Sequence, residues 1–233
     1  MKCKIDQLQE VHVFSPWLRI YHWVMGFSMP VLMLTGLYIG NPFYIGSQGI
    51  EPTFAISNFA SMANIRFLHF AVAYILLGAL ILRIYGFFIN PGDRLFPRFD
   101  KRFWDGLLET TQHYLFIKRE HRLYLRNPLA RMAYLGLYAL LFVQFTTGFA
   151  MYSMINPHSP MAKIFGPVNF LFPDERIVHQ IHHSVAWLIV LFAIVHLYMV
   201  IRTDLMEKVG EASSMISGAK FFDKEPYDIK DLQ

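Results

Sequence analysis

The chain has 233 residues, of which 55% are hydrophobic and only 16% are charged, with a formal net charge of +4. Soluble domains usually carry about a quarter charged residues, so this composition argues against an ordinary soluble protein and indicates membrane spans. A single cysteine, Cys3, excludes a disulfide framework and an iron–sulfur cluster held by this chain alone.

Four apolar stretches follow in chain order, and each is long enough to cross a hydrocarbon core of about 30 Å. They cover residues 17–39, 66–88, 131–154 and 179–201. We therefore predict an all-α fold, an integral membrane four-helix bundle. The first stretch is too long for a cleavable signal peptide, so we expect it to be retained.

Lys and Arg gather at the N-terminus, between the second and third stretches, and after the fourth. The connection at residues 40–65 has none, and the connection at 155–178 has only two. Because cytoplasmic loops carry an excess of Lys and Arg, we predict that both termini are cytoplasmic, together with the loop 90–130 and the tail 203–233. The basic residues thus report topology, and we expect no nucleic-acid binding.

Within the loop, residues 101–118 place apolar side chains at roughly helical spacing among polar ones. This pattern fits an amphipathic helix lying in the cytoplasmic membrane interface. A solvated loop is the alternative. The apolar residues are Phe103, Trp104, Leu107, Leu108, Tyr114 and Leu115.

Four histidines lie inside or at the mouths of the spans, where an ionisable residue marks a functional site by default. From the predicted topology, His22 and His196 lie near the cytoplasmic face, whereas His69 and His182 lie near the outer face. Two facing imidazoles at one depth are the axial ligands of a bis-histidine haem. The depths therefore predict two haems. Both would be non-covalent, because Cys3 alone cannot form a C-x-x-C-H attachment site.

The fourth span must then serve both haems. Its two histidines are fourteen residues apart, a separation that advances a helix by about 21 Å and returns it to within roughly 40° of the same face. His179 and His183 are rotated by about 100° and about 140° from His196, so we predict that His182 is the ligand. Any one of these histidines alone is explained as well by an interface residue. The matching of all four favours ligation.

The chain also contains a faint duplication. The pair Thr35-Gly36 recurs as Thr147-Gly148, and at an offset of 113 residues His69 falls on His182. Chance alignment of two apolar helices is the alternative. A true duplication would mean that one two-helix unit was used twice.

A series of short motifs runs along the chain in the order Arg19-Ile-Tyr-His22-Trp, Thr35-Gly36, Ile65-Arg-Phe-Leu-His69-Phe, Asn127-Pro128, Thr147-Gly148-Phe-Ala, His179-x-x-His182, His196-Leu-Tyr-Met-x-x-Arg-x-Asp204 and Ser214-Met-Ile-x-Gly218. In this order and at these spacings they resemble the b-type cytochrome subunit of membrane-bound nickel–iron hydrogenases, over nearly the whole chain. The family's haem ligands carry over onto His22, His69, His182 and His196. One departure is His183, where relatives can have another residue.

The resemblance implies a di-haem cytochrome b of the bacterial cytoplasmic (inner) membrane, holding two non-covalent haem b groups. Its partners would be membrane lipid and the small and large subunits of a nickel–iron hydrogenase on the outer face. Electrons would pass from an iron–sulfur cluster of the small subunit to the outer haem, to the cytoplasmic-side haem and then to menaquinone or ubiquinone. Hydrogen chemistry itself would not occur on this chain.

Of the sites predicted from the sequence, the quinone site has the weakest sequence support. Asn127 and Arg131 begin the third span on the cytoplasmic side, close in depth to His22, where they would reach a quinone carbonyl. Asn127-Pro128 is equally a natural helix start, with Asn as the cap and Pro in the first turn. We favour the capping interpretation.

Two rival readings stay open. The gamma subunit of a formate dehydrogenase, or the cytochrome subunit of a thiosulfate reductase, would use a similar two-haem plan, although the motifs favour hydrogenase. A haem-free membrane anchor or small transporter is the alternative from a different class. A metal-ion transporter is disfavoured because the spans lack Asp or Glu partners for a cation path.

Overall fold

The computed structural model describes residues 8–40, 61–90, 93–94, 96–97, 99–119, 122–223 and 225–228. Two compact units are present, one of residues 16–91 and the other of 1–15 together with 92–233. Four helices are long and apolar enough to cross a membrane: α1 (Pro16–Gly40) and α2 (Met62–Ile89) in the first unit, and α4 (Pro128–Ile155) and α6 (Glu175–Met206) in the second. Each predicted span lies within one of these helices, whereas most of the connection 40–65 lies outside the described residues.

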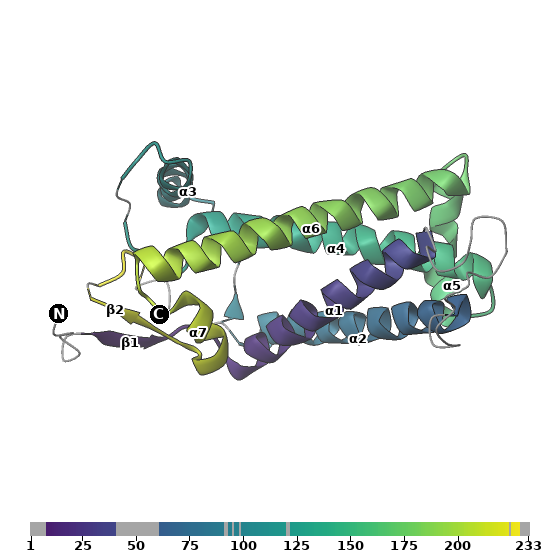
Figure 1. The fold of residues 1–233 in the computed structure, drawn as a ribbon, viewed down its shortest axis with the longest axis horizontal. Helices are drawn as coiled ribbons and strands as arrows, with labels where there is room; N and C mark the ends of the chain where they lie inside the picture. The colour runs from purple at the N-terminus through teal and green to yellow at the C-terminus, as the bar shows by residue number, and fades with distance from the viewer. Residues whose placement is uncertain are drawn as a thin grey trace, which may run out of the picture. The chain divides into compact units, whose positions relative to one another are not determined.

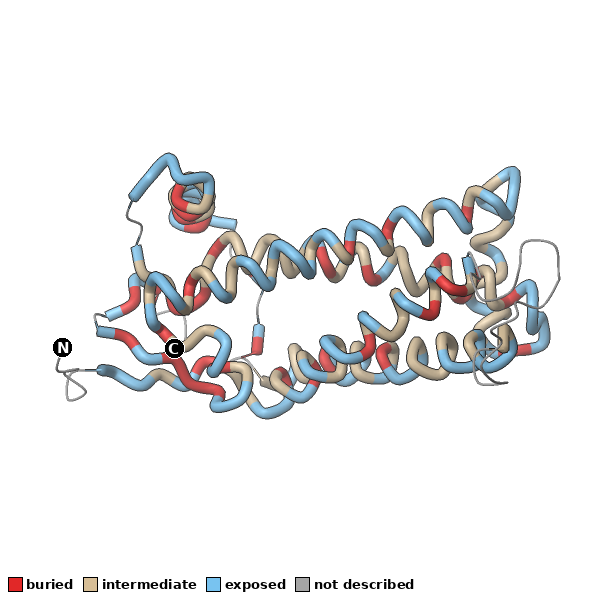
Figure 2. Tube along the Cα trace, viewed as in Figure 1, coloured by how far each residue is buried: buried red, intermediate tan, exposed pale blue. Residues whose placement is uncertain are grey.

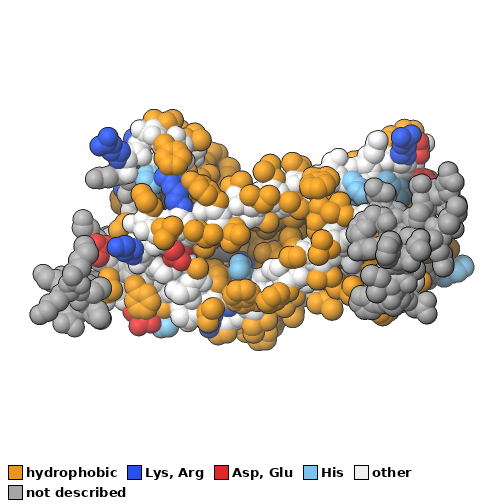
Figure 3. Space-filling view, in the orientation of Figure 1, with side chains coloured by type: hydrophobic (Ala, Val, Ile, Leu, Met, Phe, Trp, Pro, Cys, Tyr) orange, Lys and Arg blue, Asp and Glu red, His pale blue; other side chains and the backbone are white. Residues whose placement is uncertain are grey.

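The spanning helices expose large apolar side chains along their length. In Figure 2 most positions on these helices are exposed or intermediate, and Phe27 and Phe67 are 71% and 74% exposed. Figure 3 shows the same helices covered in hydrophobic side chains. Surfaces of this extent mark interaction with lipid or protein, and lipid is the expected neighbour of a spanning helix.

In the second unit, α4 and α6 pack along each other (Figure 1). The side-chain oxygen of Asn127 accepts hydrogen bonds from the backbone N–H groups of Leu129 and Ala130, at 2.9 and 3.4 Å, and Pro128 occupies the first turn of α4. The predicted capping role of Asn127 is therefore confirmed. The connection after α4 contains the short helix α5 (Pro160–Phe165) and a 3-10 helix, η4 (Gly166–Leu171).

The C-terminal tail is folded, which departs from the prediction of an all-α chain with a polar tail. Strand β2 (Ala219–Phe222) pairs antiparallel with strand β1 (Gln9–His12), and His12 lies opposite Ala219. Four side chains from well-separated parts of the chain form the small core beside these strands: Val13, Leu125, Val209 and Phe222. The two ends of the chain are thereby joined in one structure.

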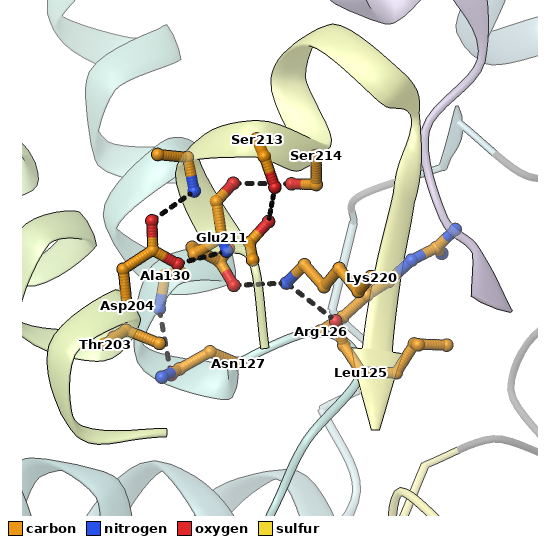
Figure 4. A network of polar contacts seen from close by, with 12 residues as sticks. Leu125, Arg126, Asn127, Ala130, Thr203, Asp204, Glu211, Ser213, Ser214 and Lys220 are labelled. Atoms are coloured by element: carbon orange, nitrogen blue, oxygen red, sulfur yellow. Dashed lines mark hydrogen bonds and ion pairs between the residues drawn. The ribbon is translucent and has the colours of Figure 1, made fainter. Parts of the chain in front are cut away.

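A network of polar contacts holds the tail in place (Figure 4). The Asp204 carboxylate accepts hydrogen bonds from the backbone N–H groups of Glu211 and Ala212, and so caps helix α7 (Glu211–Ser217). The buried Lys220 ammonium lies 2.6 Å from the Glu211 carboxylate and donates to the Leu125 carbonyl at 3.3 Å. These contacts tie the end of α6 to α7, β2 and the segment before α4.

Helix α3 (Lys101–Tyr114) confirms a helix over most of the predicted residues 101–118, although it ends at Tyr114, before Lys118. Its place in the membrane interface stays a prediction. Asp100 caps its start by accepting a hydrogen bond from the Phe103 N–H at 2.8 Å. Gly106 allows close packing, because a Cβ there would lie 2.9 Å from the Tyr124 hydroxyl and 3.1 Å from the Pro128 ring.

The ion pair of the tail gives a first prediction. Glu211→Gln would leave the Lys220 ammonium, whose side chain is 4% exposed, without its carboxylate. We expect a loss of about 2 kcal/mol of local stability, seen as faster tryptic cleavage within residues 207–228 of the purified protein. Glu225→Gln, at an exposed position of the same tail, is the matched control. Equal cleavage rates in the two variants would show that the pair contributes nothing.

Candidate haem-binding histidines

In the first unit, His69 of α2 faces a threonine and a glycine of α1. Its Nδ1 lies 2.8 Å from the Thr35 hydroxyl oxygen. The same hydroxyl lies 2.7 Å from the Val31 carbonyl oxygen, one turn earlier in its own helix. A Cβ added at Gly36 would lie 3.4 Å from His69 Cε1, so the missing side chain makes room for the imidazole.

In the second unit, His182 of α6 has the same surroundings from α4. Its Nδ1 lies 3.0 Å from the Thr147 hydroxyl oxygen, which lies 2.8 Å from the Val143 carbonyl. A Cβ at Gly148 would lie 3.1 Å from His182 Cε1. The two helix pairs thus share one local arrangement, which agrees with the duplication seen in the sequence.

The threonines fix the protonation of the two imidazoles. A hydroxyl has a single proton, and in each case it is donated to the carbonyl one turn back. With its proton directed to that carbonyl, the hydroxyl oxygen accepts from the histidine, and this network assigns the imidazole proton of His69 and His182 to Nδ1 and a lone pair to Nε2. A neutral imidazole whose second nitrogen is held by a hydrogen bond is the usual form of a metal-bound histidine. The donor set therefore fits a haem iron.

Gln144 makes the surroundings of His182 in the second unit different from those of His69 in the first. Its side-chain nitrogen lies 3.0 Å from His182 Nε2 and donates to the lone pair there. Leu32 holds the equivalent place, three residues before Thr35. For His182 to bind iron through Nε2, the Gln144 amide must turn aside. Within the described part of the chain its oxygen is buried without a hydrogen-bond partner.

The other two candidate ligands lie among aromatic rings. His196 of α6 is stacked on Phe192, with ring centroids 5.7 Å apart and an interplanar angle of 6°, and it meets Tyr134 of α4 edge-on. His22 of α1 lies edge-on to Trp23 at 5.6 Å. Both histidines are half-buried.

The three neighbouring histidines near the start of α6 differ in their exposure, and the choice of His182 as the ligand stays a prediction. His182 is half-buried against α4, whereas His179 and His183 are both exposed. An exposed imidazole at the end of a spanning helix suits the membrane interface. Each predicted haem pair takes one histidine from each unit, so the pairing of His22 with His196, and of His69 with His182, stays a prediction.

The quinone candidates have structural partners of their own. The Asn127 side-chain oxygen is used in capping α4, and the Arg131 guanidinium donates to the Phe96 carbonyl at 2.5 Å. The quinone role of these two residues stays a prediction.

Sequence reasoning did not find Gln144, and it noted the Thr-Gly pairs without giving them a role. The sequence did contain an indication of the threonines, since Thr35-Gly36 lies 34 residues before His69 and Thr147-Gly148 lies 35 residues before His182. A glutamine within an apolar span is itself a sign of function or of an interhelical hydrogen bond.

Apolar spanning helices that carry half-buried histidines, two of them held through Nδ1 by a threonine of the neighbouring helix, are typical of membrane-bound b-type cytochromes. The chain belongs to the prokaryotic cytochrome b561 family, whose model matches residues 13–218. A b-type cytochrome holds haem b, so haem b is the cofactor of this chain.

Relatives of nearly equal length are similar along most of the chain. One from Rhizobium leguminosarum bv. viciae is 36% identical over 226 residues, covering 94% of this chain and 92% of the relative. One from Bradyrhizobium diazoefficiens is 38% identical over 223 residues, covering 91% and 86%. Both carry the name "Probable Ni/Fe-hydrogenase B-type cytochrome subunit". A relative from Escherichia coli K12, named as the corresponding subunit of Ni/Fe-hydrogenase 1, is 33% identical over 230 residues and covers 94% of each chain.

The threonine contacts give a second prediction. Thr147→Val keeps the shape of the side chain but removes the acceptor of the His182 Nδ1–H, so we expect haem to be bound roughly 10- to 100-fold more weakly. The measurement is the rate of haem transfer to apomyoglobin from the purified protein. Thr147→Ser retains a hydroxyl and should bind nearly normally. Thr146→Val, on another face of α4, is the control. Retention of haem by Thr147→Val at the rate of this control would contradict the role.

The glycines give a third prediction, in which the expected order of effects is set by distance. Gly148→Ala should displace the His182 imidazole most, Gly36→Ala should displace His69 less, and Gly136→Ala should do nothing, because no atom lies within 4 Å of its Cβ position. The order is read from the low-spin electron paramagnetic resonance signals of oxidised haem, which respond to axial imidazole orientation. An unchanged spectrum in Gly148→Ala would refute the contact.

Proposed function

We propose that this chain is a di-haem cytochrome b that carries electrons from the iron–sulfur small subunit of a periplasmic-facing nickel–iron hydrogenase to the quinone pool. The observation that carries the proposal is the Thr–Gly–His arrangement present in both helix pairs, which prepares two imidazoles to bind iron. The names of the relatives supply the partner enzyme.

We assign two non-covalent haem b groups by the depths of their ligands. His69 and His182 would hold the haem near the outer face, and His22 and His196 would hold the one near the cytoplasmic face. Bis-histidine ligation fills both axial positions, so such a haem passes single electrons and leaves no position for oxygen chemistry. The separation of about 21 Å between the two ligands of α6 suits two haems stacked across one membrane.

The joined ends of the chain support the proposed topology. An even number of spans places both termini on one side of a membrane, and β1 near the N-terminus pairs with β2 near the C-terminus. The excess of Lys and Arg in the terminal and middle segments favours the cytoplasm as that side. The hydrogenase subunits would then bind at the opposite, outer face of the membrane, near His69 and His182.

For the quinone we propose a site at the start of α4, on the cytoplasmic side. Because the Asn127 oxygen is engaged in capping, its amide nitrogen is the atom left to donate to a quinone carbonyl. Arg131 lies one turn further along α4. Quinone reduction at this face would take up protons from the cytoplasm, and hydrogen oxidation by the partner would release them outside.

Ligand substitution tests the assignment and is the fourth prediction. His22→Ala and His196→Ala should each lose the same haem and spare the other, and His69→Ala and His182→Ala should do the converse. The measurement is a pyridine haemochrome per polypeptide together with reduced-minus-oxidised spectra. His179→Ala and His183→Ala are matched controls on α6, since both side chains are exposed. Two haems retained in any one ligand variant would overturn that assignment.

The wild-type protein provides the test of the whole proposal. Two haem b groups per chain, with co-purification of hydrogenase subunits, support it. A well-folded preparation without haem would favour the alternative of a haem-free membrane anchor. Co-purification with a molybdopterin enzyme would instead indicate the formate dehydrogenase or thiosulfate reductase plan.

A further inference from the structure

Helix α3 has an apolar face that the rest of its unit leaves uncovered. One face, formed by Phe103, Gly106, Thr110 and His113, is buried. A different face of the helix carries Trp104 and Leu108, whose side chains are 49% and 61% exposed. This exposed stripe continues past the end of the helix into Leu115, Phe116 and Ile117, which are 63%, 76% and 70% exposed. Contiguous exposed apolar side chains of this size mark an interaction surface.

The position of α3 in its unit places this surface at the end of a spanning helix. Tyr114 donates to or accepts from the Thr203 hydroxyl of α6 at 2.9 Å, and burial raises the pKa of the Tyr114 hydroxyl, so it stays protonated. The Arg202 guanidinium lies over the rings of Tyr114 and Phe116, at 4.9 and 4.5 Å from their centroids. Arg202 and Thr203 directly follow the predicted span 179–201. The apolar stripe therefore lies at the level where the hydrocarbon core ends.

The direction of α3 also suits a membrane surface. In Figure 1 α3 is seen end-on, whereas α4 and α6 run across the view, so α3 lies crosswise to the spanning helices of its own unit. A helix crosswise to a membrane span lies along the membrane plane. Interfacial helices bury one apolar face to about the depth of the headgroup–acyl boundary and keep a charged face in water.

The charges around α3 match an anionic surface. Exposed Lys101 and Arg102 stand at its start, and exposed Lys118 and Arg119 follow the apolar stripe. Residues 101–119 contain these four basic residues and two acidic ones, Asp105 and Glu109, and Glu109 is paired with Arg122 at 3.7 Å, so basic residues are in excess. In Figure 3 hydrophobic side chains gather over α3 and Lys or Arg side chains stand at its outer edge. Basic residues beside an interfacial helix attract anionic lipid headgroups.

We propose that α3 and residues 115–119 form an interfacial anchor, in which Trp104, Leu108 and Phe116 enter the lipid leaflet and Lys118 and Arg119 bind anionic phospholipid headgroups. The proposal of this anchor depends on the membrane spans and not on the haem or hydrogenase assignments, so it is tested independently of them. Through Arg202 and Thr203 it braces the end of α6, the helix that carries His182 and His196.

The first test measures where the stripe lies. In the full chain with Cys3→Ser, a spin label is attached at Leu108→Cys or, as the matched control, at Asp105→Cys on the charged face. Both variants are reconstituted into nanodiscs, and collisions with oxygen and with a water-soluble nickel chelate are compared. We expect the Leu108 label to meet oxygen and be shielded from the chelate, and the Asp105 label to show the reverse. Equal exposure of both labels to the chelate, or dipolar coupling between Leu108 labels of two chains, would overturn the proposal.

The second test measures the lipid class. With Trp17, Trp23 and Trp187 replaced by Phe, Trp104 is the remaining tryptophan, and its quenching by brominated phosphatidylglycerol is compared with that by brominated phosphatidylcholine. We expect a preference for the anionic lipid that falls about fivefold for each charge removed in Lys118→Gln and Arg119→Gln. Lys163→Gln, remote in sequence, is the control. Equal quenching by the two lipids, or a preference unchanged by the charge variants, would refute anionic recognition. Haem content and elution volume, measured on every variant, identify any that are misfolded.

Discussion

The hydrogen bond between a threonine hydroxyl and a histidine Nδ1, made once in each helix pair, is the interaction on which the candidate site depends. A histidine in an apolar helix pair needs a partner for each nitrogen, because an unpaired polar group in hydrocarbon is strongly unfavourable. Thr35 and Thr147 satisfy one nitrogen and determine which one it is. The glycine after each threonine lets the imidazole lie against the helix backbone. Two adjacent residues thus set both the protonation and the place of the ring.

The C-terminal end of α6 is held by three consecutive residues that make different contacts. Arg202 and Thr203 bind the end of α3, and Asp204 caps α7. Because α6 carries two of the four candidate ligands, a shift of this helix along its axis would move both at once. The C-terminal tail and α3 therefore both hold the C-terminal end of α6, although they are far apart in sequence.

Hydropathy was sufficient to predict the four spanning helices, because each one is long and its apolar run contains few charged residues. The four histidines followed from depth and helical rotation, which are properties of a single helix. The pairing of β1 with β2 was not predictable, because each strand has four residues and their partners lie about 210 residues apart. Gln144 was missed for a related reason. Its partner His182 is on another helix, and no local pattern reports a contact between helices.

The difference between Leu32 and Gln144 has a consequence under the proposed pairing. His69 and His182 would ligate one haem from opposite sides, with an apolar residue beside the first ligand and an amide beside the second. Hydrogen bonds and dipoles around axial ligands tune the reduction potential of a haem. An amide that turns its NH₂ group toward the iron favours the reduced state, and one that turns its carbonyl favours the oxidised state. Under that pairing, the difference between Leu32 and Gln144 would make the two sides of this haem electrically unequal, although the two helix pairs are otherwise alike around the histidines.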